Sequence, residues 1–213
     1  IEQIGWWGHI SMVFLFLNYL PISKHFHILL AFPNVFYSNL RNKGELNNMQ
    51  SVKKEVSMMF DPSVDPYATP AESTSTGEPP ARFGAKDVVD LTWVNLLNAY
   101  TCTECGRCSS SCPANQTGKK LSPRKIMMDT RDRLEEVGRN YRKHGVGHDD
   151  GKSLLGDYIT EEEVWACTSC NACVEECPVN IDPLSIIIDL RRYLVMEESK
   201  SPSELTTMFT NIE

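Results

Sequence analysis

Two runs of cysteines decide the fold of this chain: Cys102-Thr-Glu-Cys105-Gly-Arg-Cys108-Ser-Ser-Ser-Cys112-Pro113 and Cys167-Thr-Ser-Cys170-Asn-Ala-Cys173-Val-Glu-Glu-Cys177-Pro178. The second run begins 65 residues after the first and repeats its spacing. Together they contain all eight cysteines of the chain, so no thiol remains for a core position or a separate disulfide framework. We therefore interpret the cysteines as metal ligands.

The spacing indicates which metal is bound. Three cysteines at two-residue intervals allow a short backbone segment to wrap around a cubane cluster, while the fourth, before proline, points away. In two-cluster ferredoxins this fourth cysteine ligates the other cluster. By that rule we expect two [4Fe–4S] clusters with crossed ligation. Cluster 1 is assigned to Cys102, Cys105, Cys108 and Cys177, and cluster 2 to Cys167, Cys170, Cys173 and Cys112.

Two structural zinc ions or four disulfides are the alternatives. Zinc sites usually use two Cys-x-x-Cys pairs per ion, which leaves the third cysteine and the Cys-Pro of each run unexplained. Disulfides require an oxidising compartment and rarely join cysteines at this spacing.

The composition excludes some functions. The chain of 213 residues has a net charge of −7 and a pI near 5.3, which argues against a nucleic-acid surface. It begins with Ile1 and lacks the features of a signal peptide. We interpret it as a fragment of a longer protein.

The first forty residues predict a transmembrane helix. Residues 3–23 carry no formal charge and could cross a hydrocarbon core at ~1.5 Å per residue. We expect Pro21 to kink this helix near Leu17 and the stretch to Leu40 to extend it as one rod. Basic residues follow, which places the C-terminal side in the cytoplasm and the anchor in the inner membrane.

Two histidines in this segment, His9 and His27, are candidate haem ligands. They are 18 residues apart, so on a continuous helix they would share one face and stand ~27 Å apart. Ionisable groups at membrane depth are usually functional. The alternative is a pair of interfacial histidines, and we interpret His25 as an interface residue.

This segment resembles the last haem-carrying helix of the nitrate reductase gamma subunit family, through His9, the apolar run after it, and Pro21-Ile22-Ser23-Lys24-His25-Phe26-His27. The resemblance implies that His9 and His27 each give one axial ligand to a b-type haem. The opposite ligands would come from an earlier helix that is absent from this sequence.

The remainder divides into a linker and a second domain. Residues 41–85 are rich in Pro, Ser and Thr, which predicts a linker. We expect this linker to join residues 1–40 to an α-helical two-cluster ferredoxin domain at residues 86–213. We expect helices from Asp87 to Tyr100, after Ser122-Pro123, after the capping box at Thr160, and after Asp182-Pro183. Strand signals are scarce, so the fold class is all-α. The 54 residues between Cys112 and Cys167 suit an inserted helix pair.

Residues 82–200 resemble the ferredoxin-like module of the heterodisulfide reductase C subunit and of membrane-bound iron–sulfur oxidoreductases, and more loosely the helical cluster domain of succinate dehydrogenase. Cys-Thr-Glu-Cys-Gly-Arg-Cys and Cys-Pro-Ala carry the resemblance. With the haem-type helix it implies a fused architecture whose partners are menaquinone or another quinone and a cysteine-rich, heterodisulfide reductase B-like subunit.

The expected function is electron transfer within a multi-subunit oxidoreductase, between a quinone pool and that cysteine-rich subunit, with no terminal substrate site in this chain. We expect the partner to cover the helix from Asp182 to Met196 and the tail 201–213. The competing interpretations are an iron–sulfur redox sensor or structural interaction module without a quinone link, and a membrane-tethered zinc module.

Overall fold

The computed structural model describes residues 2–23, 25–42, 44–49, 52–53, 56, 60 and 82–212. Its regular elements are helices, and in these residues the only β pairing is an isolated bridge between Leu155 and Ile159. The expected all-α character is therefore confirmed. In the predicted linker, residues 43, 50–51, 54–55, 57–59 and 61–81 lie outside the described residues.

The first two helices of the described chain do not form one rod. Helix α1 (Glu2–Tyr19) ends in a 3-10 turn, η1 (Leu20–Ile22), and α2 (Phe26–Phe36) leaves it at an angle of 57°. Pro21 lies in the turn and has no backbone N–H to continue the α-helical hydrogen bonds. The expectation of one kinked rod to Leu40 is therefore wrong, because the helix stops at this turn.

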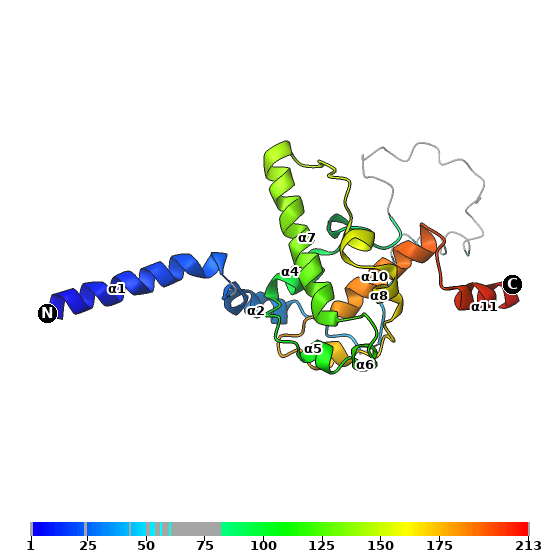
Figure 1. Ribbon diagram of the computed structural model, residues 1–213, viewed down its shortest axis with the longest axis horizontal. Coiled ribbons are helices and arrows are strands. Elements are labelled where there is room, and N and C mark those ends of the chain that lie inside the picture. The colour runs from blue at the N-terminus through cyan, green and yellow to red at the C-terminus, as the bar shows by residue number, and fades with distance from the viewer. Residues whose placement is uncertain are drawn as a thin grey trace.

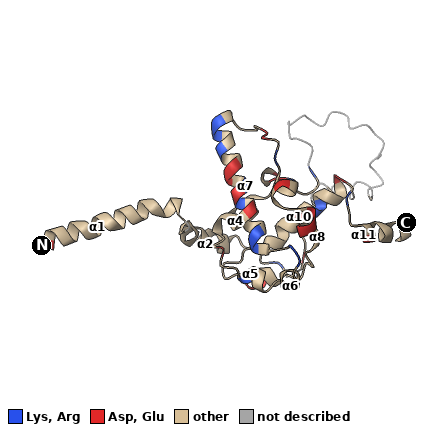
Figure 2. Ribbon diagram, viewed as in Figure 1, with Lys and Arg blue, Asp and Glu red and all other residues tan. Residues whose placement is uncertain are grey.

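Within the described part of the chain, no single helix is long and apolar enough to cross a membrane. The bent pair of α1 with η1 and α2 meets that test by length and composition. Helix α1 projects away from the rest of the molecule (Figure 1) and exposes nearly all its side chains, Trp7, Phe14 and Leu15 among them. Glu2 is the single acidic or basic residue of α1, and the helix beyond it is tan in Figure 2.

Helix α2 packs on the cysteine-containing domain. It contacts α4 (Trp93–Thr101), and the rings of Tyr37 and Trp93 meet edge to face at 4.8 Å. Asn34 is only 2% exposed, and its Nδ2 donates to the carbonyl oxygen of Val179 at 2.8 Å. The end of the N-terminal segment therefore lies against the loop that follows Cys177.

Helices α7 and α10 form the centre of the domain. The remaining elements are η2 (Val88–Asp90), α5 (Arg107–Ser110), α6 (Pro113–Gln116), α7 (Pro123–His144), the turn η3 (Leu154–Tyr158), α8 (Glu161–Trp165), α9 (Ala172–Glu175), α10 (Pro183–Met196) and α11 (Ser203–Ile212). Ile126 and Met127 of α7 and Ile186, Ile187 and Leu190 of α10 are fully buried. Burial of each such side chain contributes about 1.5–3 kcal/mol. The insertion between the motifs, expected to be a helix pair, contains the long helix α7 and the short helices α6 and α8.

Three of the predicted helix starts are confirmed. Ser122 and Asp182 cap α7 and α10 by accepting from the backbone N–H groups of Lys125 and Ser185, and Thr160 with Glu163 forms the capping box of α8. The helix expected from Asp87 begins only at Trp93, because the hydroxyl of Thr92 caps it there. Asp87 instead caps η2 and binds Arg133.

The packed domain begins before residue 86. The backbone N–H of Ala85 donates to the carbonyl oxygen of Asp189 at 3.0 Å, and that of Phe83 donates to the carboxylate of Glu197 at 2.9 Å. Gly84, with φ of +84°, lets the strap of residues 82–85 lie directly on α10. A Cβ at Gly84 would stand 2.4 Å from the carbonyl oxygen of Asp189.

Candidate iron–sulfur site

The two cysteine loops have the same backbone conformation. Two and four residues after the first cysteine of each loop, the chain adopts a left-handed conformation, at Glu104 and Gly106 in the first loop and at Ser169 and Asn171 in the second. Three of these four are not glycine, and such strained positions persist where the surrounding structure holds them, often at functional sites. A one-turn helix, α5 or α9, then carries the third cysteine, and α5 and α9 contact each other. The repeated motif is therefore a repeated structure.

Four thiols from both motifs gather around the first loop. Burial raises the pKa of Cys102, and the nearby thiols of Cys108 and Cys177 raise it further. Burial likewise raises the pKa of Cys108, with added contributions from Cys105 and Cys177. Cys177, at the end of the second motif, is thus an electrostatic neighbour of the first loop.

The second loop has the reciprocal arrangement. Burial raises the pKa of Cys167, and Cys112 and Cys170 raise it further. Burial raises the pKa of Cys173 to about 12, with smaller contributions from Cys167, Asp182, Cys108 and Cys112. Cys112, at the end of the first motif, therefore lies near the second loop.

The donor set fits two iron–sulfur clusters. All eight cysteines are free, and the middle cysteine of each loop, Cys105 or Cys170, is exposed. Thiolates that are buried beside one another repel, so bound iron is needed to hold them deprotonated. No three His, Cys, Asp or Glu side chains of the described residues converge as the ligands of one metal ion do.

Backbone amides approach the first thiol of each loop. The N–H of Ser169 donates to Sγ of Cys167 at 3.4 Å, and a backbone hydrogen bond from Glu104 lowers the pKa of Cys102, against the larger effect of burial. Hydrogen bonds to the sulfurs are one of the features that set the potential of an iron–sulfur cluster.

Sequence reasoning missed two arginines that contact these loops. Arg131 of α7 forms an ion pair with Glu104, with Nη2 and Oε1 2.7 Å apart. Arg191 of α10 donates from Nη1 to Oγ of Ser169 at 3.2 Å and from Nη2 to the carbonyl oxygen of Cys167. Each arginine therefore contacts the left-handed residue between the first two cysteines of one loop.

A second internal repeat could have revealed these arginines. Helix α7 begins at Pro123, after its N-cap Ser122, and α10 begins at Pro183, after its N-cap Asp182. Arg131 and Arg191 each stand nine residues after the N-cap. The matching segments are Pro-Arg-Lys-Ile-Met-Met-Asp-Thr-Arg at 123–131 and Pro-Leu-Ser-Ile-Ile-Ile-Asp-Leu-Arg at 183–191. The repeat thus includes the helix that follows each motif.

The structure separates the two histidines that were predicted to share a helix face. His9 lies on α1, where it is exposed, and His27 lies on α2, beyond the break at Leu20–Ile22. The rings of His25 and His27 lie 6.5 Å apart. Because the helix between His9 and His27 is interrupted, the premise of five uninterrupted turns is wrong, and haem ligation by these histidines stays a prediction.

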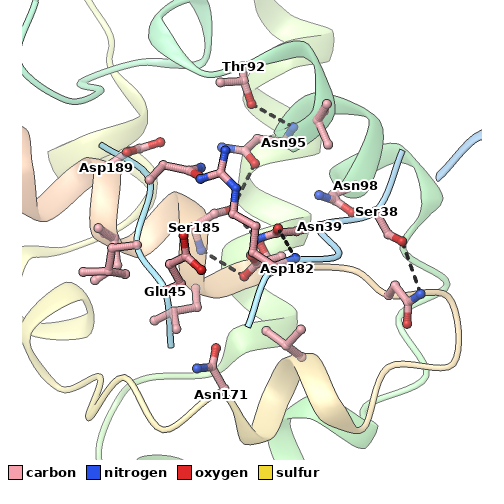
Figure 3. Close-up of a pocket in the computed structure, with 18 of the residues that line it drawn as sticks. Ser38, Asn39, Glu45, Thr92, Asn95, Asn98, Asn171, Asp182, Ser185 and Asp189 are labelled. Carbon is pink, nitrogen blue, oxygen red and sulfur yellow. Dashed lines mark hydrogen bonds between the residues drawn. The ribbon is translucent and has the colours of Figure 1, made fainter. Parts of the chain in front are cut away.

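A polar cleft of about 680 Å³ lies where segment 37–47 meets α4, α9 and α10. Figure 3 shows Asn95 at its wall, where its Oδ1 accepts a hydrogen bond from Oγ of Ser185 at 2.9 Å and so joins α4 to α10. Asn171 of the second cysteine loop and Asp182 also line the cleft. This cleft adjoins the second motif but brings no further cysteine or histidine to it.

The expected partner surface is only partly exposed. Leu184, Ile186, Ile187, Leu190 and Leu194 of α10 are buried in the core, so only the remaining side of this helix is open to a partner, and its coverage stays a prediction. Helix α11 has no buried residue and exposes Met208, Phe209 and Ile212. An exposed apolar cluster therefore remains at the C-terminal end.

Residues 98–181 match the family described as 4Fe-4S dicluster domain. Over its whole length the chain is 34% identical to the probable iron-sulfur-binding oxidoreductase FadF of Bacillus subtilis and 29% identical to the EtfAB:quinone oxidoreductase of Syntrophomonas wolfei. It covers 31% and 29% of these two proteins. No solved structure matches the chain.

A third similarity covers the cysteine-containing part. Over 114 residues the chain is 31% identical to the C subunit of the ferredoxin/F(420)H(2)-dependent CoB-CoM heterodisulfide reductase of Methanosarcina acetivorans, and the match covers 53% of this chain and 56% of that protein. This similarity agrees with the expected resemblance to heterodisulfide reductase C, and none of the three names mentions haem. The stretch that contains all eight cysteines, residues 98–181, is therefore similar to the 4Fe-4S dicluster domains.

Proposed function

We propose that this chain is the iron–sulfur electron-transfer segment of a membrane-anchored oxidoreductase, with two [4Fe–4S] clusters in crossed ligation. Cluster 1 is held by Cys102, Cys105, Cys108 and Cys177, and cluster 2 by Cys167, Cys170, Cys173 and Cys112. When bound, such a cluster accepts and donates one electron at a time. The chain itself supplies the ligands, their burial and the surrounding charges.

The observation that carries this proposal is that the fourth cysteine of each run acts electrostatically on thiols of the other loop. Cys177 raises the pKa of Cys102 and Cys108, and Cys112 raises that of Cys167. The contact between α5 and α9 brings the two loops together. Two redox sites this close within one chain are suited to passing electrons in series rather than to one isolated structural site.

The two ends of the molecule support separate partners. Helix α1 exposes apolar side chains around its whole circumference, which is stable only in an apolar surrounding such as a lipid bilayer or a helix bundle. The exposed Met208, Phe209 and Ile212 of α11 lie at the other end, as the separation of the N and C labels in Figure 1 shows. We propose a quinone pool as the membrane-side partner and a soluble, cysteine-rich redox subunit as the other. The name of the Syntrophomonas relative supports the quinone.

Cysteine variants test the crossed ligation. Full-length protein purified anaerobically should contain about eight irons per chain, and zinc in their place would contradict the proposal. Under crossed ligation, Cys177→Ser should damage the same EPR signal as Cys102→Ser. Cys112→Ser should damage the same signal as Cys167→Ser. If Cys177→Ser instead matches Cys167→Ser, each motif binds its own cluster and the crossed assignment is wrong.

Membranes that contain the whole protein test the route of the electrons. A quinol analogue should reduce the clusters, or the quinone should reoxidise them, as followed by EPR. The matched control is protein that lacks residues 1–22 and retains both clusters, which should respond to a soluble reductant but not to the quinol. If intact membranes respond only to the soluble reductant, the quinone link is wrong and the redox-sensor interpretation is favoured.

A further inference from the structure

Arg131 and Arg191 occupy equivalent positions but meet different residues. Each stands nine residues after its helix N-cap and reaches the second residue after the first cysteine of a loop. That residue is Glu104 in the first loop and Ser169 in the second, and both have positive φ, of 60° and 55°. The two halves therefore share an arginine and a backbone conformation, but only the first has a carboxylate at this position.

The charge of Arg131 is cancelled locally. Its Nη2 lies 2.7 Å from Oε1 of Glu104, and the two side chains are 20% and 19% exposed. Its Nε also lies 3.6 Å from Oδ1 of Asp132. A close pair of opposite charges that is largely shielded from solvent presents little net charge to its surroundings. Cluster 1 therefore has a neutral ion pair beside its loop.

The charge of Arg191 is not cancelled in this way. Its Nε and Nη2 donate to the carbonyl oxygen of Val164 at 3.1 and 2.8 Å, its remaining acceptors are the carbonyl of Cys167 and the hydroxyl of Ser169, and its guanidinium lies 5.3 Å from the ring centre of Trp165. All these partners are neutral. In the described part of the chain no carboxylate forms an ion pair with Arg191.

The neighbouring acid of the second half has a different role. Asp182 raises the pKa of the Cys173 thiol. Its carboxylate also caps α10 by accepting a hydrogen bond from the backbone N–H of Ser185 at 3.0 Å. The Arg191 side chain is half-buried and donates to the carbonyl oxygen of Cys167. Arg191 thus brings a partly desolvated positive charge to the second loop.

We propose that Arg131 and Arg191 are equivalent positioning residues of the two cluster loops, and that only Arg191 raises the reduction potential of its cluster. The inference rests on the crossed-cluster function proposed above. Reduction adds one negative charge to a cluster, so an uncompensated cation beside it favours the reduced form. The Arg131–Glu104 pair fixes the first loop with little effect of charge, because its two charges oppose each other.

Variants of Arg191 test the charge directly. In an anaerobic redox titration followed by EPR, Arg191→Gln should lower the midpoint potential of one cluster and leave the other in place. Arg191→Lys keeps the charge and should retain more of the wild-type potential than Arg191→Gln. The matched control is Arg192→Gln on the same helix, because Arg192 is already paired with Asp189 at 3.0 Å.

Exchanging the residues of the two loops gives a second, independent test. Ser169→Glu should lower the same midpoint as Arg191→Gln, whereas Glu104→Ser should raise the other midpoint by removing the nearest carboxylate of Arg131. The double variant Glu104→Gln with Arg131→Gln should return that midpoint towards the wild-type value. The inference is overturned if variants that retain about eight irons show unchanged midpoints, or if Ser169→Glu and Glu104→Ser move the same one. A wild-type protein without clusters would overturn the proposed function as well, and the iron content separates the two results.

Discussion

Arg133 joins three separate segments of the cluster domain through one buried guanidinium. It forms ion pairs with Asp87, before α4, and with Asp150, in the loop after α7, each at 2.7 Å, and it also donates to the carbonyl oxygen of Lys152. Its side chain is 3% exposed. These charged hydrogen bonds raise the pKa of Arg133 and lower that of Asp150. The segment before the first motif and the insertion are thereby fixed to the same helix.

Arg133→Met should lower the free energy of unfolding by about 3–5 kcal/mol, because it leaves two partly buried carboxylates without their cation. Anaerobic thermal unfolding followed by circular dichroism measures the loss. Arg139→Met is the matched control on the same helix, since Arg139 is exposed and lies 3.6 Å from Glu135, and it should cost less than about 1 kcal/mol. Equal effects of the two variants would contradict the structural role of Arg133.

The hydrogen bond between Tyr158 and Glu136 leads us to expect that the protein loses stability at alkaline pH. Its hydroxyl donates to Glu136, which raises the pKa of Tyr158, and burial adds to the effect. Because the folded pKa lies above the unfolded value of about 10, the contribution is complete below pH ~10 and is lost as pH rises through the folded pKa. In melting experiments from pH 8 to 11, Tyr158→Phe should lower stability near pH 8 and reduce the fall at alkaline pH. A Tyr158→Phe curve parallel to that of the wild type would contradict this origin.

Gly84 is required for the contact between the strap and α10. Gly84→Ala would place a Cβ 2.4 Å from the carbonyl oxygen of Asp189 and 2.5 Å from the backbone nitrogen of Tyr193, at a φ of +84°. The backbone cannot yield as a flexible side chain can, so the free energy of unfolding should fall by about 2–4 kcal/mol. Thermal unfolding measures this loss. Gly118→Ala, also at positive φ but with no atom within 4 Å, separates backbone strain from the clash.

At the scale of elements, the break between α1 and α2 decides how the histidines can act. If His9 and His27 are axial haem ligands in the intact protein, His9→Ala and His27→Ala should each remove one b-type haem and leave the other. Pyridine haemochrome spectra of native membranes measure this loss, and His25→Ala is the control. Unchanged spectra in both variants, or the absence of cytochrome absorbance in the wild type, would show that the histidines are not ligands.

Helices α7 and α10 each form part of the core and also place an arginine against a cysteine loop. Their apolar sides form the core through residues such as Met127 and Ile187, and four residues further along each helix an arginine reaches a cysteine loop. Since residues four apart share a helix face, the position of each arginine follows from the burial of its helix. Packing of the core and placement of the loops are therefore coupled.

At the scale of the whole molecule, cluster binding should contribute to folding. The cysteine loops contain strained left-handed residues and buried thiols that repel when ionised, so the apo domain lacks the interactions that hold these loops. Removal of iron by a chelator under anaerobic conditions should reduce the helical circular dichroism and lower the melting temperature. Reconstitution with iron and sulfide should restore both. Unchanged melting after complete iron loss would contradict the coupling.

The sequence by itself determined the features that depend on neighbouring residues. The cysteine spacing indicated the cofactor, in agreement with the dicluster match, and Ser122, Thr160 and Asp182 marked helix starts because a cap acts within three residues. The near absence of strand signals indicated an all-α fold. Spacing alone did not locate the helix break, since the 3-10 turn that contains Pro21 ends α1 completely rather than bending it.

Only the tertiary structure decided which distant residues meet. The contact of Asn34 with Val179, the Arg133 network, and the contacts of Arg131 and Arg191 with the cysteine loops join segments far apart in the chain. Such pairs depend on how α2, α7 and α10 pack, and the packing of a core is set by all its side chains together rather than by a local pattern. The same dependence explains why α10, which we expected to be covered by a partner, contributes to the core, while the short α11 remains exposed.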